Sequence, residues 1–129
     1  MKNFFYKLVS FILSFFLLIY LWFYIELLGF GGLLIFLKKK RTNLLNISCI
    51  SYVSRSIKLI CFVFPCFKCL VRASVVKTIF SETESLRLII GINKNEEKSF
   101  ESHAWITFDN KIVLNNDLKT NAYKIIHTI

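Results

Sequence analysis

Cys69 and His103 are the two residues of this sequence best suited to nucleophilic chemistry together. A thiol attacks a carbonyl only as the thiolate, and both a helix N-terminus and a nearby imidazole favour that anion. We therefore expect Cys69 to be the nucleophile of a hydrolase and His103 to be its general base. A third group, usually Asp or Asn, must accept the other ring N–H of the imidazole.

The third group of this site depends on the register of a hairpin that follows His103. If residues 109–111 form a three-residue loop, Asn115 and Asp117 lie on the face of His103. A two-residue loop puts Asn116 there instead, because a slip of one residue turns every side chain to the other face. Asn115 and Asp117 are the two candidates for orienting the imidazole.

A helix is expected to carry Cys69. It begins at Pro65 or Phe67, since proline suits the first helical turn, and it continues to Phe80. Four residues recur at helical spacing and share the face expected to meet the core: Cys69, Ala73, Val76 and Phe80. Cys69 therefore lies in the first or second turn.

Three later segments predict a small sheet. Leu86–Ile92 is apolar and rich in β-branched residues, and Phe100–Phe108 places His103 and Trp105 on one face. Lys111–Asn115 returns as a third strand after a turn. The order of one helix and three strands predicts an α+β fold, with the helix packed on an antiparallel sheet.

The N-terminal part has a different composition. Leu8–Ile25 is an uncharged run of eighteen residues, close to the length of a membrane-spanning helix. A signal peptide would end in small residues suited to cleavage, and none follow. We expect residues 1–41 to be a membrane anchor and residues 42–129 to be the catalytic domain. The alternative is a pair of apolar helices packed on that domain and broken near Gly29.

Basic residues follow this apolar segment directly, at positions 38–41. Such a cluster stays on the cytoplasmic side of a membrane and can contact anionic headgroups. The expected location is the cytoplasmic face of the cell membrane. Nucleic-acid binding is not expected, because no stripe of basic residues alternates with aromatic ones.

The other cysteines, Cys49, Cys61 and Cys66, are expected to be reduced packing residues in a cytoplasmic protein. A buried structural thiol is the alternative for Cys69 itself. Cys66 and Cys69 also form a C-x-x-C pair, but a zinc site needs a second close pair, and a redox site needs a βαβ context. No metal and no cofactor is expected.

Three blocks together resemble one family: Cys69-Leu70-Val71-Arg72-Ala73, the strand ending in Ile90-Gly91-Ile92, and His103-Ala104-Trp105-Ile106. Over residues 64–116 the chain is similar to the transglutaminase-like cysteine peptidases of lasso-peptide (microcin-type) maturation. The resemblance implies a transglutaminase/papain-like core and a peptidase that removes the leader from a ribosomally made peptide precursor. It also implies two partners, a small leader-binding protein and an ATP-dependent cyclase.

The sequence departs from that family at two places. Asn115 stands where the family usually has Asp, with Asp117 two residues further on, and the helix end has Ser81-Glu82-Thr83 in place of the usual Gly. A non-catalytic, membrane-anchored, transglutaminase-like binding module is therefore the alternative function.

Overall fold

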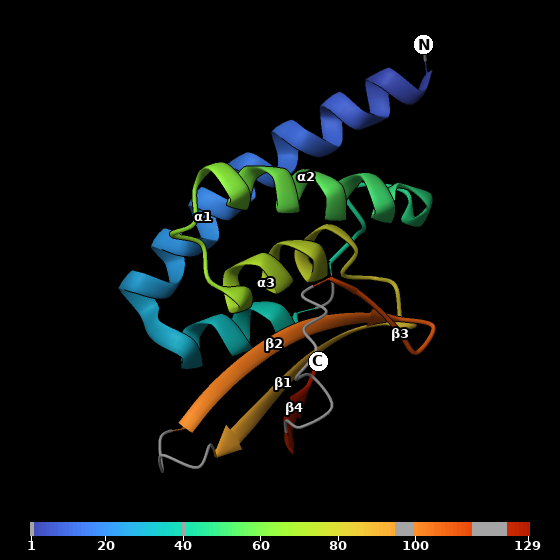
Figure 1. The fold of residues 1–129 in the computed structure, drawn as a ribbon. Coiled ribbons are helices and arrows are strands. Elements are labelled where there is room, and N and C mark those ends of the chain that lie inside the picture. Colours follow the sequence, from blue (N-terminus) through green and yellow to red (C-terminus); the bar gives the residue numbers. More distant parts are fainter. Residues whose placement is uncertain (1, 40, 95–99, 115–123) are drawn as a thin grey trace.

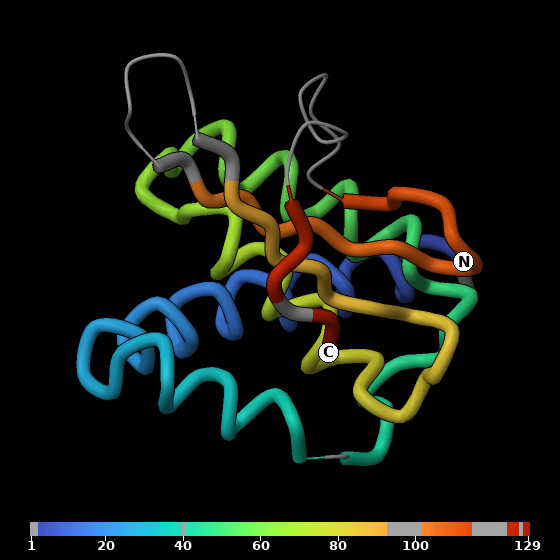
Figure 2. The backbone as a smooth tube through the Cα atoms, turned by 90° about the horizontal axis from the view of Figure 1, so that it is seen from below, coloured from blue at the N-terminus to red at the C-terminus, as the bar shows by residue number. Residues whose placement is uncertain are grey.

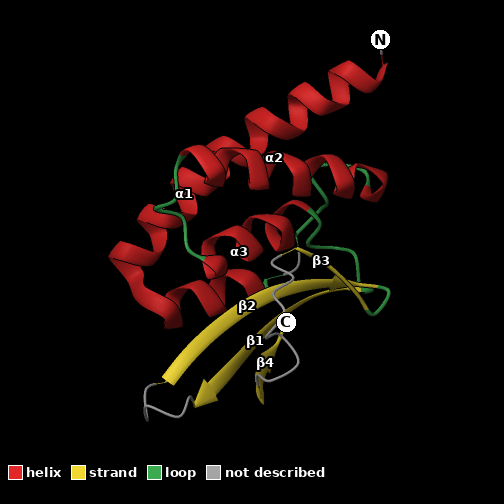
Figure 3. Cartoon of the chain, in the orientation of Figure 1, coloured by secondary structure: helices red, strands yellow, loops and turns green. Residues whose placement is uncertain are grey.

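The structure is a computed structural model that describes residues 2–39, 41–94, 100–114 and 124–129. Its helices gather on one face of a single sheet (Figures 1 and 3). The elements follow in the order α1 (Lys2–Lys38), a short 3-10 helix (Ile47–Cys49), α2 (Ile50–Val63), α3 (Cys69–Ile79), β1 (Leu86–Lys94), β2 (Phe100–Phe108), β3 (Lys111–Leu114) and β4 (Lys124–Thr128). The expected α+β fold is confirmed.

The strands form an antiparallel sheet in the order β3-β2-β1-β4. Three of them match the predicted strands, and β4 was not predicted. It pairs with β1 at the edge opposite to β3, as Figure 2 shows. Its Ile125-Ile126 pair was the available signal, because adjacent β-branched residues favour strands.

The hairpin between β2 and β3 closes on two residues rather than three. Asp109 and Asn110 both have positive φ, which is typical of the tight turn that joins antiparallel strands. Phe108 consequently pairs with Lys111. An irregularity between Ile106 and Thr107 then shifts the pairing by one residue.

The helix that carries Cys69 begins later than predicted. Lys68 is extended, with φ −75° and ψ 165°, so Cys69 is the first residue of α3. Pro65 lies instead just after Phe64, the residue that caps the end of α2. A proline cannot continue the helix that precedes it, and that role fits Pro65 better than a helix start.

The core lies between the helices and the sheet. Ala73 and Val76 of α3, and Phe80 directly after it, are fully buried there, as predicted, against Leu88 of β1 and Ile106 of β2. The N-terminal segment shares this core, since Leu18, Leu21, Leu33 and Leu37 of α1 belong to the same cluster.

The N-terminal segment breaks at Gly29 into two apolar helical segments, as in the alternative of two helices broken near this residue. Phe36 of the second segment contacts Tyr20 and Tyr24 of the first, with ring centroids 6.4 and 5.0 Å apart, so the chain turns back on itself (Figure 1). Gly29 has φ 71° and ψ −174°, a conformation open almost only to glycine. By length and composition, α1 is the one helix among the described residues that could cross a membrane, with a mean hydropathy of 2.4. A core helix of a soluble protein or a signal sequence can have the same length and composition.

Candidate functional site

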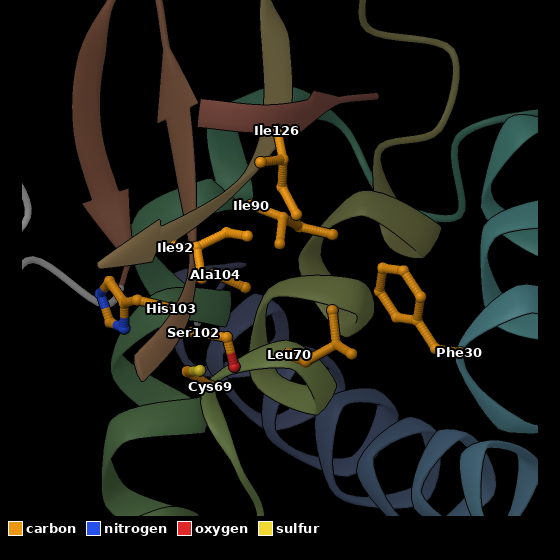
Figure 4. Close-up of a pocket in the computed structure, with 9 residues that line it drawn as sticks. All are labelled: Phe30, Cys69, Leu70, Ile90, Ile92, Ser102, His103, Ala104 and Ile126. Carbon is orange, nitrogen blue, oxygen red and sulfur yellow. The ribbon is translucent and has the colours of Figure 1, made fainter. Parts of the chain in front are cut away.

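An apolar cavity of about 270 Å³ lies where the start of α3 meets the sheet (Figure 4). Its walls come from five elements, and its lining is almost wholly hydrocarbon. It is lined by Phe30, Cys69, Leu70, Ile90, Ile92, Ser102, His103, Ala104 and Ile126. The cavity therefore has both residues of the predicted nucleophile–base pair in its wall.

Cys69 is half-buried at the N-terminal end of α3. The first N–H groups of a helix point outward and carry its partial positive charge, so this end favours an anion such as a thiolate. The segment before Cys69 is held by Arg72, whose Nε donates a hydrogen bond to the carbonyl oxygen of Phe67 over 2.8 Å. Cys69 was predicted to lie in the first or second turn of a helix, and it is the first residue of α3.

His103 lies on β2, where it pairs with Gly91 of β1. Its ring stacks on Trp105, with centroids 5.6 Å apart and planes inclined by 25°. Side chains alternate along a strand, so His103 leaves β2 on the side opposite to Ser102 and Ala104 (Figure 4). The predicted common face of His103 and Trp105 is thus confirmed.

The structure brings Cys69 and His103 to one cavity, but it does not place the third member of the site. Asn115 and Asp117 both lie outside the described residues. The nearest described pair of that hairpin is Ile106 with Leu114. Beyond the irregularity, this pairing has the register that a three-residue loop would have produced.

Three residues of the cavity were missed by sequence reasoning: Ser102, Phe30 and Ile126. Ser102 contributes a hydroxyl on the side of β2 that faces Leu70 (Figure 4), and it immediately precedes His103 in the chain. Phe30 comes from α1, directly after the kink at Gly29. No local pattern connects Phe30 to the site, since the connection exists only through tertiary packing.

The remaining cysteines differ in their surroundings. Cys49 and Cys61 are buried, as expected of packing residues, whereas Cys66 is exposed and that expectation is wrong for it. Pro65 and Cys66 lie in the turn between α2 and α3, which has little to pack against. Burial raises the pKa of the Cys61 thiol above its ordinary value of 9.0, although the nearby Arg72 opposes the shift. Within the described residues, no three His, Cys, Asp or Glu side chains cluster as a metal site would require.

Comparison with known proteins gives one family. A family model described as the transglutaminase-like superfamily matches residues 36–128. The match begins near the end of α1 and includes α2, α3 and all four strands, with Cys69 and His103 inside it. No curated protein and no solved structure gives a significant match.

Proposed function

Because this chain belongs to the transglutaminase-like superfamily, we propose that it is a cysteine peptidase with Cys69 as nucleophile and His103 as general base. Membership alone suggests a cysteine-peptidase-like or related function. The observation that carries the proposal is that Cys69, the first residue of a helix, lines the same cavity as His103.

The proposed reaction proceeds through a thioester. Cys69 attacks the scissile carbonyl while His103 accepts the thiol proton, and His103 then gives that proton to the leaving amine. Water hydrolyses the thioester and regenerates the thiol. N–H groups in the first turn of α3 stabilise the negative oxygen of the tetrahedral intermediate, and Asn115 or Asp117 orients the imidazole. The imidazole must come within hydrogen-bond reach of the thiol when peptide is bound, and such contacts commonly tighten only at that stage.

The cavity favours a peptide with an apolar side chain beside the scissile bond. Leu70, Ile90, Ile92 and Ile126 offer that side chain contact and no charge. Burying one such side chain contributes about 1.5–3 kcal/mol. We propose the leader–core junction of a ribosomally made lasso-peptide precursor as the substrate, which would make the protein part of bacteriocin maturation. A small leader-binding protein and an ATP-dependent cyclase are the proposed partners.

The proposed location is the cytoplasmic face of the cell membrane. Two features support it: the long apolar helix α1 and the basic residues 38–41 at its end. Positively charged residues beside an apolar helix are attracted to the anionic headgroups of the cytoplasmic leaflet. The catalytic domain would then meet its precursor where that precursor is synthesised.

The test compares cleavage of a leader-containing precursor by the wild-type protein and two cysteine variants. Cys69→Ala should abolish cleavage. It should also abolish the thioester adduct that we expect mass spectrometry to detect on Cys69 of the wild-type protein. Cys66→Ala is the matched control, because this exposed thiol lies three residues earlier and outside the cavity, and it should retain full activity. Cleavage by Cys69→Ala at the wild-type rate would exclude the proposal.

A non-catalytic binding module remains the second candidate function, and one observation favours it. His103 stacks on Trp105, on the side of β2 away from Ala104. Alkylation with iodoacetamide separates the two functions. In an enzyme, Cys69 should react faster than Cys66 at neutral pH, and His103→Ala should remove the difference. In a binding module, Cys69 should react more slowly than the exposed Cys66.

A further inference from the structure

Helix α1 exposes large apolar side chains on the side that faces away from the protein, unlike a surface helix of a water-soluble domain. Its buried stripe begins with two serines and continues with leucines: Ser10, Ser14, Leu18 and Leu21. Its opposite stripe is exposed and wholly uncharged: Ile12, Phe16, Tyr20, Phe23 and Leu27. The exposed fraction reaches 64% at Phe16 and 80% at Leu27. A helix normally turns such an apolar stripe toward the core.

The exposed stripe continues onto the end of α2. Phe15 of α1 contacts Phe64, which follows α2, with ring centroids 6.3 Å apart. Beside it, Phe62 is 87% exposed and Leu59 is 58% exposed. The apolar surface of α1 and of the end of α2 therefore forms one patch, larger than the scattered apolar residues of an ordinary surface.

Positive charge is concentrated in the same part of the chain. Residues 1–80 contain eleven Lys and Arg and a single acidic residue, Glu26. Lys38, Lys39 and Arg41 follow the segment that turns back after Gly29. Arg41 lies over the ring of Phe36, 3.8 Å from its centroid, and Phe36 contacts Tyr20 of the stripe. Lys7 lies near the start of α1, over the ring of Tyr52. An apolar stripe with cations beside it matches the interfacial layer of a membrane with anionic headgroups.

We propose that the first segment of α1, residues 2–28, and the end of α2 lie in the plane of an anionic bilayer, with the exposed stripe embedded in one leaflet. Such a helix is buried only to about the depth of the headgroup–acyl boundary. The cations beside the stripe then reach headgroups of the same leaflet. This arrangement is independent of the proposed peptidase activity.

Packing argues against a membrane-spanning α1. Lys7 lies over the ring of Tyr52, and Phe15 contacts Phe64, so the first half of α1 runs beside the whole of α2. If α1 crossed the bilayer, it would carry the exposed Arg55 and Lys58 of α2 into hydrocarbon. Charged side chains at that depth are strongly unfavourable.

The buried stripe leads to the same conclusion. Leu18 and Leu21 are fully buried in a cluster that also contains Val71 of α3 and Leu88 of β1. A spanning helix would have to leave this core. An in-plane helix keeps it and covers only its outer side with lipid.

Depth measurements on the full-length protein in vesicles test the proposal. An environment-sensitive fluorescent amino acid replaces Phe16 or Leu27 of the stripe, or Phe4, which is 72% exposed near the start of α1. Quenchers are attached at fixed depths of the lipid chain. We expect all three positions to report the same shallow depth in vesicles of 70% phosphatidylcholine and 30% phosphatidylserine. The exposed Lys111 of β3 is the control site and should not be quenched.

Other results would overturn the proposal and identify what replaces it. Deep quenching at Phe16 with shallow quenching at Phe4 and Leu27 would show a spanning helix. An absence of quenching at all three, with a dimer in light scattering, would assign the patch to a second copy of the chain.

A second measurement tests the charge contribution. Lys38→Gln with Lys39→Gln should weaken binding to these vesicles about 25-fold, since each cation near an anionic surface contributes about fivefold. Lys111→Gln should leave binding unchanged. Equal binding of the wild-type protein to vesicles with and without phosphatidylserine would exclude the role of anionic headgroups.

Discussion

Replacing Ser14 by alanine should stabilise this protein. The hydroxyl of Ser14 is fully buried in the inner stripe of α1, and its Oγ has no hydrogen-bond partner among the described residues. Folding removes this group from water without replacing the hydrogen bonds that it loses. Ser14→Ala removes the hydroxyl and leaves the rest of the helix in place.

Two favourable contributions and one unfavourable contribution set the size of the effect. Leaving a buried hydroxyl unpaired costs about 1–3 kcal/mol, and alanine is a better helix former than serine by about 0.5 kcal/mol. The contacts of one lost oxygen atom are worth only a few tenths of a kcal/mol. We expect the free energy of unfolding to rise by about 1–2 kcal/mol, which corresponds to a rise in Tm of about 3–8 °C.

Ser74 provides a matched control in α3. It is also fully buried, but its Oγ donates a hydrogen bond to the carbonyl oxygen of Leu70 over 2.6 Å. Ser74→Ala removes a satisfied hydrogen bond, so we expect no gain and a loss of up to about 1 kcal/mol.

The assay is thermal and urea unfolding of both variants in one mild detergent, followed by circular dichroism. If Ser14→Ala destabilises the protein as much as Ser74→Ala does, the idea of an unpaired hydroxyl is refuted. An unchanged Tm for both would show that neither hydroxyl contributes to stability.

Three further predictions concern stability. Gly29→Ala should lower the free energy of unfolding by about 1–3 kcal/mol, because Gly29 has positive φ. Gly31→Ala should raise the free energy of unfolding by up to about 1 kcal/mol, since nothing lies near the added carbon. Urea unfolding measures both. Phe80→Ala should cost about 3–5 kcal/mol in the same assay, because Phe80 is fully buried. Burial raises the pKa of Cys61 above 9.0, so the unfolded thiol ionises before the folded one as the pH rises. The contribution of Cys61 to the free energy of unfolding should therefore be fully present below pH 9 and fall above it. Unfolding measured between pH 8 and 10.5 should show a smaller fall for Cys61→Ala than for the wild-type protein.

Each of these predictions has a contradicting result. Equal effects of the two glycine variants would show that the kink needs no special backbone conformation. A loss below 1 kcal/mol for Phe80→Ala would place its ring outside the core. An identical pH dependence for Cys61→Ala and the wild-type protein would assign the fall to other groups.

Much of the domain could be predicted from local patterns. The helix that carries Cys69 was predictable because its apolar residues repeat at helical spacing. The strand around Gly91 was predictable as a run of apolar and β-branched residues, and the strand of His103 from the residues that share one of its faces. The start of α3 was placed too early, since Pro65 fits the end of one helix as well as the start of the next. The hairpin register was open because it depends on the turn and on a bulge, which local sequence determines weakly.

The candidate site was predictable only in part. Cys69 and His103 stand out because thiol and imidazole are reactive and have recognisable neighbours in the chain. Phe30 and Ile126 line the same cavity from opposite ends of the sequence, and only the folded chain brings them there. The burial of one side of α1 was equally hidden, since both sides of this helix are rich in apolar residues.

The position of Phe30 has a consequence for how a substrate would arrive. Phe30 is both a wall of the cavity and a partly exposed neighbour of Leu27 and Leu28 in the patch proposed to meet lipid. A peptide adsorbed on the same leaflet would search for the cavity by diffusion in two dimensions. Its apolar side chain could pass from lipid to the cavity without crossing bulk water. The kink at Gly29 would then lie on the path of the peptide between the membrane surface and the thiol of Cys69.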